Sequence, residues 1–178
     1  MQLNFKDSIV SNRGVAAACL VVAVGAGATA CATAPVRPDP VATATAAEQA
    51  HCDKPLAEDP RIFSPEVVTS VSPLTRSYPF GKSERTVLAG SQIVIPAQPG
   101  WTAEWITRNL ICHQADLLLG RASAPYDDAY WLPGRWLEFG VRSRADAFVV
   151  EIDAPDPESA NAVLARSRAL LAHRVAAP

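Results

Sequence analysis

Two segments in the first half of the chain show the hydrophobic pattern of β-strands. Residues 67–71 alternate with a period of two, which is typical of a half-buried strand, and Pro73 should end it. Residues 87–95 are mostly apolar and β-branched and stop at Pro96. We therefore predict two strands over these ranges.

A second strand pair is predicted between residues 137 and 152. Leu137, Phe139 and Val141 lie on one face of the first strand, and residues 148–152 repeat the alternation. Residues 143–146 are small or polar and can form the turn. This pattern indicates a β-hairpin.

Helical signals follow each strand pair. Thr102 can cap a helix that runs to Leu119 and stops at Gly120, which favours the left-handed terminal conformation. Asp156 and Pro157 are typical of a helix start. The second helix carries one apolar stripe, formed by Ala160, Val163, Leu164, Leu170 and Leu171.

The order strand–strand–helix thus occurs twice. A shift of 57 residues superimposes similar residues at the two strand–helix junctions, for example Ile95 on Ile152 and Ala97 on Ala154. Either an ancient duplication or chance similarity explains this likeness. We predict an α+β domain with a four-stranded antiparallel sheet and both helices on one face (β-β-α-β-β-α).

The first thirty residues have the features of a secretory signal peptide. Lys6 and Arg13 precede the uncharged segment 15–30, and the segment ends in Ala28-Thr29-Ala30-Cys31. This ending resembles the lipobox of bacterial lipoproteins, in which the Cys is lipidated after cleavage. The resemblance implies that Cys31 carries the lipid and that the protein faces the periplasm.

Other fates of the leader remain open. Ala28 and Ala30 also suit ordinary signal peptidase, which would release a soluble secreted protein, and an uncleaved leader would be a membrane anchor. Some bacterial lipoproteins are retained in the inner membrane by an Asp after the lipidated Cys. Ala32 stands at that position here, so the family rule favours the outer membrane over the inner one.

The sequence after Cys31 divides into three parts. Residues 31–50 are rich in Ala, Thr, Pro and Val and contain no aromatic residue, which predicts a flexible tether. Residues 51–65 should form an irregular lead-in, and residues 66–175 a single domain. A flexible chain of some twenty residues spans about 25 Å and would hold the domain clear of the lipid headgroups.

Charge argues against one class of partner. Without the leader, which holds Lys6, Arg13 and Asp7, the chain has 14 basic and 17 acidic residues. Binding to nucleic acid requires concentrated positive charge, so we expect no nucleic-acid partner.

Two cysteines remain in the folded part, Cys52 and Cys112. In an oxidising compartment they are expected to pair, and the bridge should stabilise the fold by about 3–4 kcal/mol. Buried free thiols are an alternative. A zinc or copper site formed by His51, Cys52, Cys112 and His113 is another, although adjacent residues of a helix point about 100° apart.

Aromatic residues gather in the middle of the chain, and one segment combines them with charges. Exposed rings beside carboxylates can stack on sugars or bind a protein, whereas rings folded inwards would only cover the sheet. Both interpretations apply to the same candidate residues: Tyr126, Asp127, Tyr130, Trp131, Arg135 and Trp136.

No catalytic motif is recognisable in the sequence. Phosphate-binding loops, zinc-protease motifs and nucleophile elbows are all missing, and nothing indicates a cofactor. We therefore expect a non-enzymatic envelope lipoprotein that binds another envelope component, protein or glycan. The alternative hypothesis is a periplasmic copper- or zinc-handling protein.

Overall fold

The computed structural model describes residues 38–52, 60–123 and 128–176. These residues belong to one compact unit, which begins at Arg37. The predicted signal peptide, the lipobox and Cys31 lie outside the described residues. Among the described residues, no helix has the length and apolar character needed to cross a bilayer.

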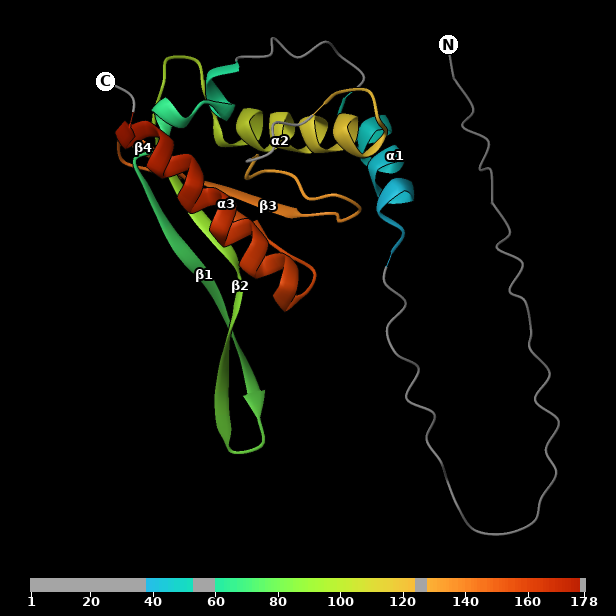
Figure 1. Cartoon of the computed structure of the whole chain (residues 1–178), viewed down its shortest axis with the longest axis vertical. Coiled ribbons are helices and arrows are strands. Elements are labelled where there is room, and N and C mark those ends of the chain that lie inside the picture. Colours follow the sequence, from blue (N-terminus) through green and yellow to red (C-terminus); the bar gives the residue numbers. More distant parts are fainter. Residues whose placement is uncertain (1–37, 53–59, 124–127, 177–178) are drawn as a thin grey trace, which may run out of the picture. The chain divides into compact units, whose positions relative to one another are not determined.

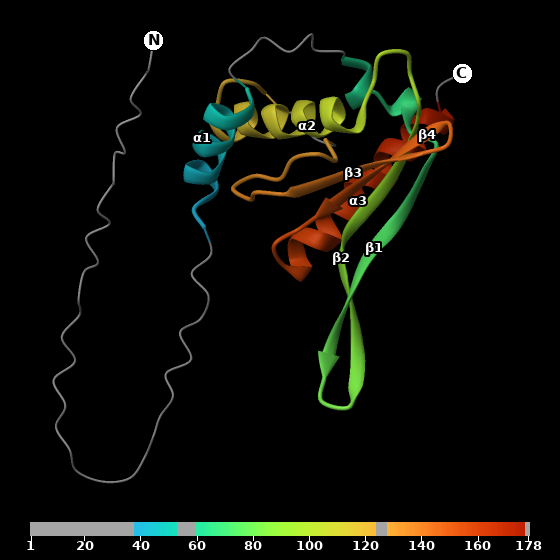
Figure 2. The same cartoon turned by 180° about the vertical axis from the view of Figure 1, so that it is seen from behind.

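The domain has the predicted α+β architecture (Figures 1 and 2). Four antiparallel strands form one sheet in the order β1-β2-β4-β3. The strands are β1 (Ser70–Phe80), β2 (Ser83–Pro96), β3 (Glu138–Arg144) and β4 (Ala147–Asp153). The helices are α1 (Pro40–His51), α2 (Ala103–Leu118) and α3 (Pro157–Ala176), with short 3-10 helices η1 (Pro60–Phe63) and η2 (Pro65–Val67).

The predicted starts of α2 and α3 are confirmed in detail. The side chain of Thr102 accepts a hydrogen bond from the amide of Trp105 at 3.1 Å. Asp156 accepts one from the amide of Ser159 at 2.7 Å. Each cap satisfies an amide that has no partner within its own helix.

The core lies between the sheet and the helices. Alternate residues of β2 and β4 face α3, which lies across the sheet, and α2 adds apolar side chains to the same cluster (Figure 1). The cluster includes Ile93, Ile95, Val150, Ile152, Ile106, Leu110, Val163 and Leu170. Both helices therefore cover one face, as expected.

The other face of the sheet carries a row of polar side chains that spans all four strands. Gln92 donates to Glu151 at 3.0 Å, and Arg142 pairs with the same carboxylate at 2.8 Å. Ser72 donates to Gln92 at 3.4 Å. This face resembles the solvated side of a two-layer α+β domain.

The first strand differs from the prediction at both ends. It begins at Ser70 rather than at residue 67, and it continues past Pro73 to Phe80. Pro73 does not end it because β1 is an edge strand, where the missing N–H breaks no ladder. Its partner β2 is likewise longer than predicted and starts at Ser83.

The predicted tether is wrong over residues 40–50, which belong to α1, and so is the predicted irregular lead-in at His51, the last residue of this helix. Asp39 caps this helix, Pro40 starts it, and five of its residues are alanine, the best helix former. The helix packs on α2 and buries Ala44. The predicted irregular lead-in is also wrong over residues 60–63, which form η1, and at Pro65, where η2 begins. Residues 53–59 lie outside the described residues.

The central ladder between β2 and β4 repeats the 57-residue relation seen in the sequence. Ile95 pairs with Phe148, and Ser91 pairs with Ile152. The shift of 57 residues converts the first pair into the second, because it places Ile95 on Ile152 and Ser91 on Phe148.

Hydrogen bonds at the two ends of this ladder obey the same relation. The amide of Ala97 donates to the carbonyl of Asp146 at 2.8 Å, and the amide of Ala154 donates to the carbonyl of Ala89 at 2.8 Å. Antiparallel pairing by itself has this local two-fold symmetry, and any odd shift within the ladder reproduces it. The ladder therefore does not decide between duplication and chance similarity.

Gly90 lies close to the backbone of β4, beside an irregularity in the pairing of β1 with β2. A Cβ atom at Gly90 would overlap the carbonyl oxygen of Ile152. We expect Gly90→Ala to lower the free energy of unfolding by about 3 kcal/mol, because backbone atoms must move apart. Urea unfolding measures the change.

Gly140→Ala is the matched control in the same sheet. There the added Cβ would lie 3.7 Å from its nearest neighbour, an ordinary contact distance. Its effect should stay within about 0.5 kcal/mol. Equal effects of the two variants would contradict the close approach at Gly90.

Candidate functional site

The two cysteines form a disulfide, as predicted first. The bridge between Cys52 and Cys112 has an S–S distance of 2.01 Å and ties the end of α1 to the middle of α2. Both thiols are consumed, so neither can bind a metal ion as a thiolate. The four-residue metal site expected as an alternative is therefore wrong, and the described part of the chain contains no other group of three or more potential ligands.

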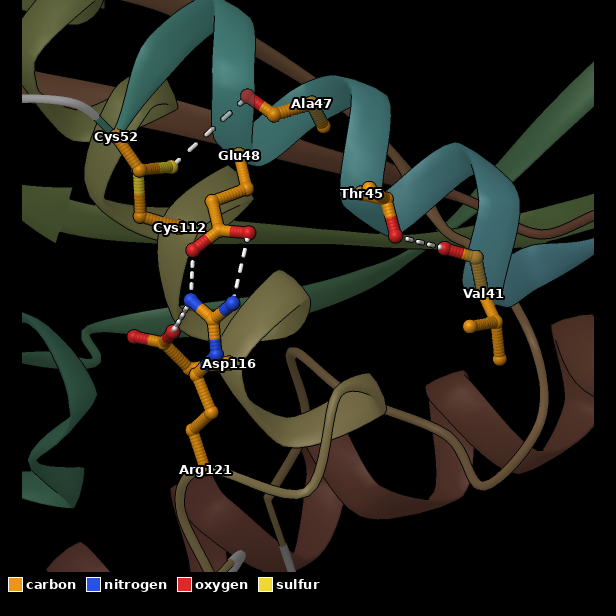
Figure 3. A network of polar contacts seen from close by, with 8 residues as sticks. All are labelled: Val41, Thr45, Ala47, Glu48, Cys52, Cys112, Asp116 and Arg121. Atoms are coloured by element: carbon orange, nitrogen blue, oxygen red, sulfur yellow. Dashed lines mark hydrogen bonds and ion pairs between the residues drawn. A yellow bond between two sulfur atoms is a disulfide. The ribbon is translucent and has the colours of Figure 1, made fainter.

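Polar contacts reinforce the disulfide (Figure 3). The carboxylate of Glu48 on α1 faces the guanidinium of Arg121, and Asp116 lies 3.9 Å from the same guanidinium. At the end of α1, Arg108 donates to the carbonyl oxygen of His51 at 2.5 Å. These contacts make α1 an integral part of the domain.

His113 is paired with a carboxylate rather than with a metal ion. Its Nε2 lies 2.7 Å from a carboxylate oxygen of Asp128, and its ring stacks on Phe63 at 4.1 Å between centroids. The side chain of Asp128 is 5% exposed, so the imidazole satisfies a carboxylate that has almost no access to water. The sequence analysis assigned no role to Asp128.

The His113–Asp128 pair has two of the groups used in nucleophilic catalysis, an imidazole and the carboxylate that orients it. A catalytic pair also needs a hydroxyl or thiol within hydrogen-bonding distance of the imidazole. In residues 38–52, 60–123 and 128–176, the polar contact of His113 is with Asp128, and the neighbouring Cys112 is in the disulfide. The pair therefore anchors the segment after residue 128 to α2.

The aromatic segment divides between core and surface. Tyr130 is 1% exposed and packs in the core with Phe63, as the packing interpretation predicted. Trp131 is half-buried, and its carbonyl oxygen accepts a hydrogen bond from Arg166 at 2.8 Å. Tyr126 and Asp127 lie outside the described residues.

Arg135 and Trp136 are the two predicted binding residues that line a cleft. The cleft has a volume of about 250 Å³ and lies between the first turn of α1, the adjoining ends of β3 and β4, and the start of the loop to α3. Its remaining walls are Pro38, Pro40, Thr43, Glu138, Asp153, Ala154 and Pro155. The sequence analysis missed these residues, since they come from three separate segments and only folding brings them together.

Charges around the cleft are mostly neutralised by neighbours. Arg135 lies 3.5 Å from Asp156, and Arg76 lies 3.0 Å from Asp153. Glu138 is exposed and has no recorded partner among the described residues. The cleft thus combines an apolar wall, the half-buried ring of Trp136 and one available carboxylate, which suits a ring-sized group with a hydrogen-bond donor.

Comparisons of the chain with protein-family models, with curated proteins and with solved structures found no match.

Tyr130 gives the described structure a testable pH dependence. Burial raises the pKa of its hydroxyl, and the nearby charge of Asp128 raises it further. An unfolded tyrosine ionises near pH 10, whereas the folded one resists ionisation. The fold should therefore lose stability as the pH rises above about 10, because only the unfolded state releases this proton.

Tyr130→Phe should remove this alkaline loss. At neutral pH it should raise the free energy of unfolding by about 1 kcal/mol, since the buried hydroxyl has no hydrogen-bond partner among the described residues. Urea unfolding at neutral and alkaline pH measures both effects. Tyr78→Phe, at a hydroxyl that is exposed, should change neither, and an unaltered alkaline slope in Tyr130→Phe would refute the assignment.

Proposed function

We propose that this protein is a non-enzymatic bacterial envelope lipoprotein whose α+β domain binds another envelope component, a protein or a glycan. The observation that carries the proposal is the cleft at Trp136. Its ring offers a face for an apolar side chain or a sugar, and Glu138 offers an acceptor for a hydroxyl or ammonium group.

The position of the cleft supports a role close to the membrane. Pro38 and Pro40 form part of its wall, and they stand only seven and nine residues after Cys31. Such a segment reaches at most about 25–32 Å when fully extended. A lipid at Cys31 would therefore hold the cleft near the surface of its own membrane, not at the end of a long flexible tether as the sequence analysis expected.

We propose binding rather than catalysis at this site. The second carboxylate in the wall of the cleft, that of Asp153, is engaged with Arg76. Glu138 alone supplies no acid–base pair, which hydrolysis of a glycan usually requires. The proposal accordingly assigns no catalytic residue and no cofactor.

Lipidation is tested at Cys31. The Cys31→Ser variant should incorporate no labelled fatty acid and should accumulate as unprocessed precursor or as a form cut by ordinary signal peptidase. The domain should keep its wild-type melting temperature, because Cys31 precedes the compact unit. Wild-type protein that incorporates no fatty acid and stays soluble when membranes are pelleted would refute the lipoprotein assignment.

Ligand binding is tested by substitution in the cleft. We expect Trp136→Ala to lower capture of the partner from solubilised envelopes, or the affinity for isolated envelope glycans, by at least about tenfold. Glu138→Gln should weaken binding by a smaller factor, because the amide keeps an acceptor but loses the charge. Retention of a specific protein or of a glycan distinguishes the two partner classes.

Matched controls are available outside the cleft. Phe80→Ala removes another exposed ring, and Glu84→Gln neutralises another exposed carboxylate, both on the β1–β2 hairpin. Neither should alter ligand binding at the cleft. Unchanged capture by Trp136→Ala would contradict the proposed site.

A further inference from the structure

The β1–β2 hairpin extends well beyond the rest of the sheet (Figures 1 and 2). Strand β4 pairs with β2 only over residues 90–96, so residues 75–80 and 83–88 pair only with each other. We call residues 75–88 the arm. All of its residues are exposed except Val87 and Leu88, which are intermediate.

The arm has two faces of different chemistry. Residues opposite each other in an antiparallel pair share a face, and neighbours along a strand alternate. Tyr78 is paired with Arg85, and Phe80 with Ser83, on one face. The opposite face holds Ser77 paired with Thr86, and Pro79 paired with Glu84.

The aromatic face is unusual for a surface. Among the described residues, three large apolar side chains are classed as exposed, and two of them are Tyr78 at 55% and Phe80 at 69%. Both stand at the tip of the arm. A two-stranded ribbon has no core of its own to bury them, so the rings stay exposed on the domain and offer an apolar surface for contact with another component.

Positive charge surrounds the rings. The arm contains Arg76, Lys82 and Arg85 but only one acidic residue, Glu84, whereas the whole chain has a net charge of −2. Arg76 is paired with Asp153, and Lys82 and Arg85 have no recorded ion pair in the described part of the chain. Aromatic rings flanked by basic side chains are the composition that binds the headgroup region of an anionic membrane.

The edge of the arm argues for a membrane rather than a strand of another protein. Pro73 and Pro79 on the edge strand β1 cannot donate to an added strand, so they protect this edge from pairing.

We infer that the arm is a membrane-docking device, which places Tyr78 and Phe80 in the headgroup region while Lys82 and Arg85 bind lipid phosphates. With the lipid at Cys31 that the proposed function assigns, the arm is a second attachment point. Two attachment points orient the domain, and the cleft at Trp136 then keeps a constant position above the bilayer.

Flotation with lipid vesicles tests the inference without the lipid anchor. The protein is the chain from Arg37 to Pro178, which contains the whole compact unit but neither the leader nor Cys31. It should float with vesicles of phosphatidylglycerol and phosphatidylethanolamine and much less with phosphatidylcholine vesicles. High salt should weaken the binding, because it screens the contacts with phosphate.

Paired variants separate the two contributions. Tyr78→Ser with Phe80→Ser should lower vesicle binding by about tenfold or more, because two rings no longer enter the interface. Lys82→Gln with Arg85→Gln should lower it by about tenfold at low salt. The matched control for charge is Arg144→Gln with Arg168→Gln, which removes two exposed arginines elsewhere and should have little effect.

A second control changes the opposite face of the same arm, through Ser77→Ala with Thr86→Ala, and should leave binding intact. The inference fails if the wild-type chain does not float with anionic vesicles, if it binds neutral vesicles equally, or if the aromatic double variant binds like the wild type. The inference is also refuted if the arm binds another protein but the chain binds no vesicle.

If the Tyr78→Ser, Phe80→Ser double variant does not fold, a fluorescent variant tests whether the tip of the arm enters the membrane. Phe80→Trp keeps a large aromatic ring at the tip. Relative to the wild type, its additional emission should shift to the blue on anionic vesicles and be quenched by brominated lipid. Emission that vesicles leave unchanged would refute insertion of the tip.

Discussion

Pairing of β2 with β4 is the interaction on which the domain depends. It joins two strand–strand–helix halves into one sheet, through residues 90–96 of β2 and 147–153 of β4. Only this register places the alternate residues of both strands on the side of the helices, because a slip by one residue would turn each apolar side chain outward. The core, the overlap at Gly90 and the position of Trp136 all follow from it.

The first half differs from the second in two ways that bear on function. Its hairpin is longer, and the extra length forms the arm that carries Tyr78 and Phe80. The helix α1 is an addition outside the repeat, and the Cys52–Cys112 disulfide holds it on α2. The sheet with α2 and α3 supplies the platform, the arm supplies the surface that we propose contacts the membrane, and α1 completes the cleft that we propose binds the ligand.

The disulfide bears on how the domain is attached as well as on its stability. A pinned α1 leaves only residues 32–39 between Cys31 and the helix, so the reach of the domain is short. The same helix contributes Pro40 and Thr43 to the cleft. Reduction of the bridge would therefore loosen one wall of the proposed binding site and lengthen the connection to the proposed anchor at the same time.

Among the candidate binding residues, the structure distinguishes a core residue from a residue that lines the cleft, which the sequence alone could not do. Tyr130 and Trp136 are both aromatic residues in a charged segment, yet Tyr130 lies in the core and Trp136 lines the cleft. The difference arises because Asp128 is fixed by His113 and accepts a hydrogen bond from the amide of Tyr130, which turns that residue inward. No local pattern encodes a contact between residues fifteen positions apart.

The sequence by itself determined the elements whose signals are local. Thr102 and Asp156 cap helices through atoms three residues away, and the alternation in residues 137–152 is enough to define a hairpin. Tertiary structure decided whatever depends on distant partners. It packed α1 on α2 through the Cys52–Cys112 bridge, although the helix itself has local signals in its cap and its alanines. It allowed Pro73 within a strand because β1 is at the edge, and it formed the cleft from three segments. The physical reason is that propensity and capping act within a few residues, whereas burial, disulfide pairing and strand order depend on contacts that form only when the chain folds.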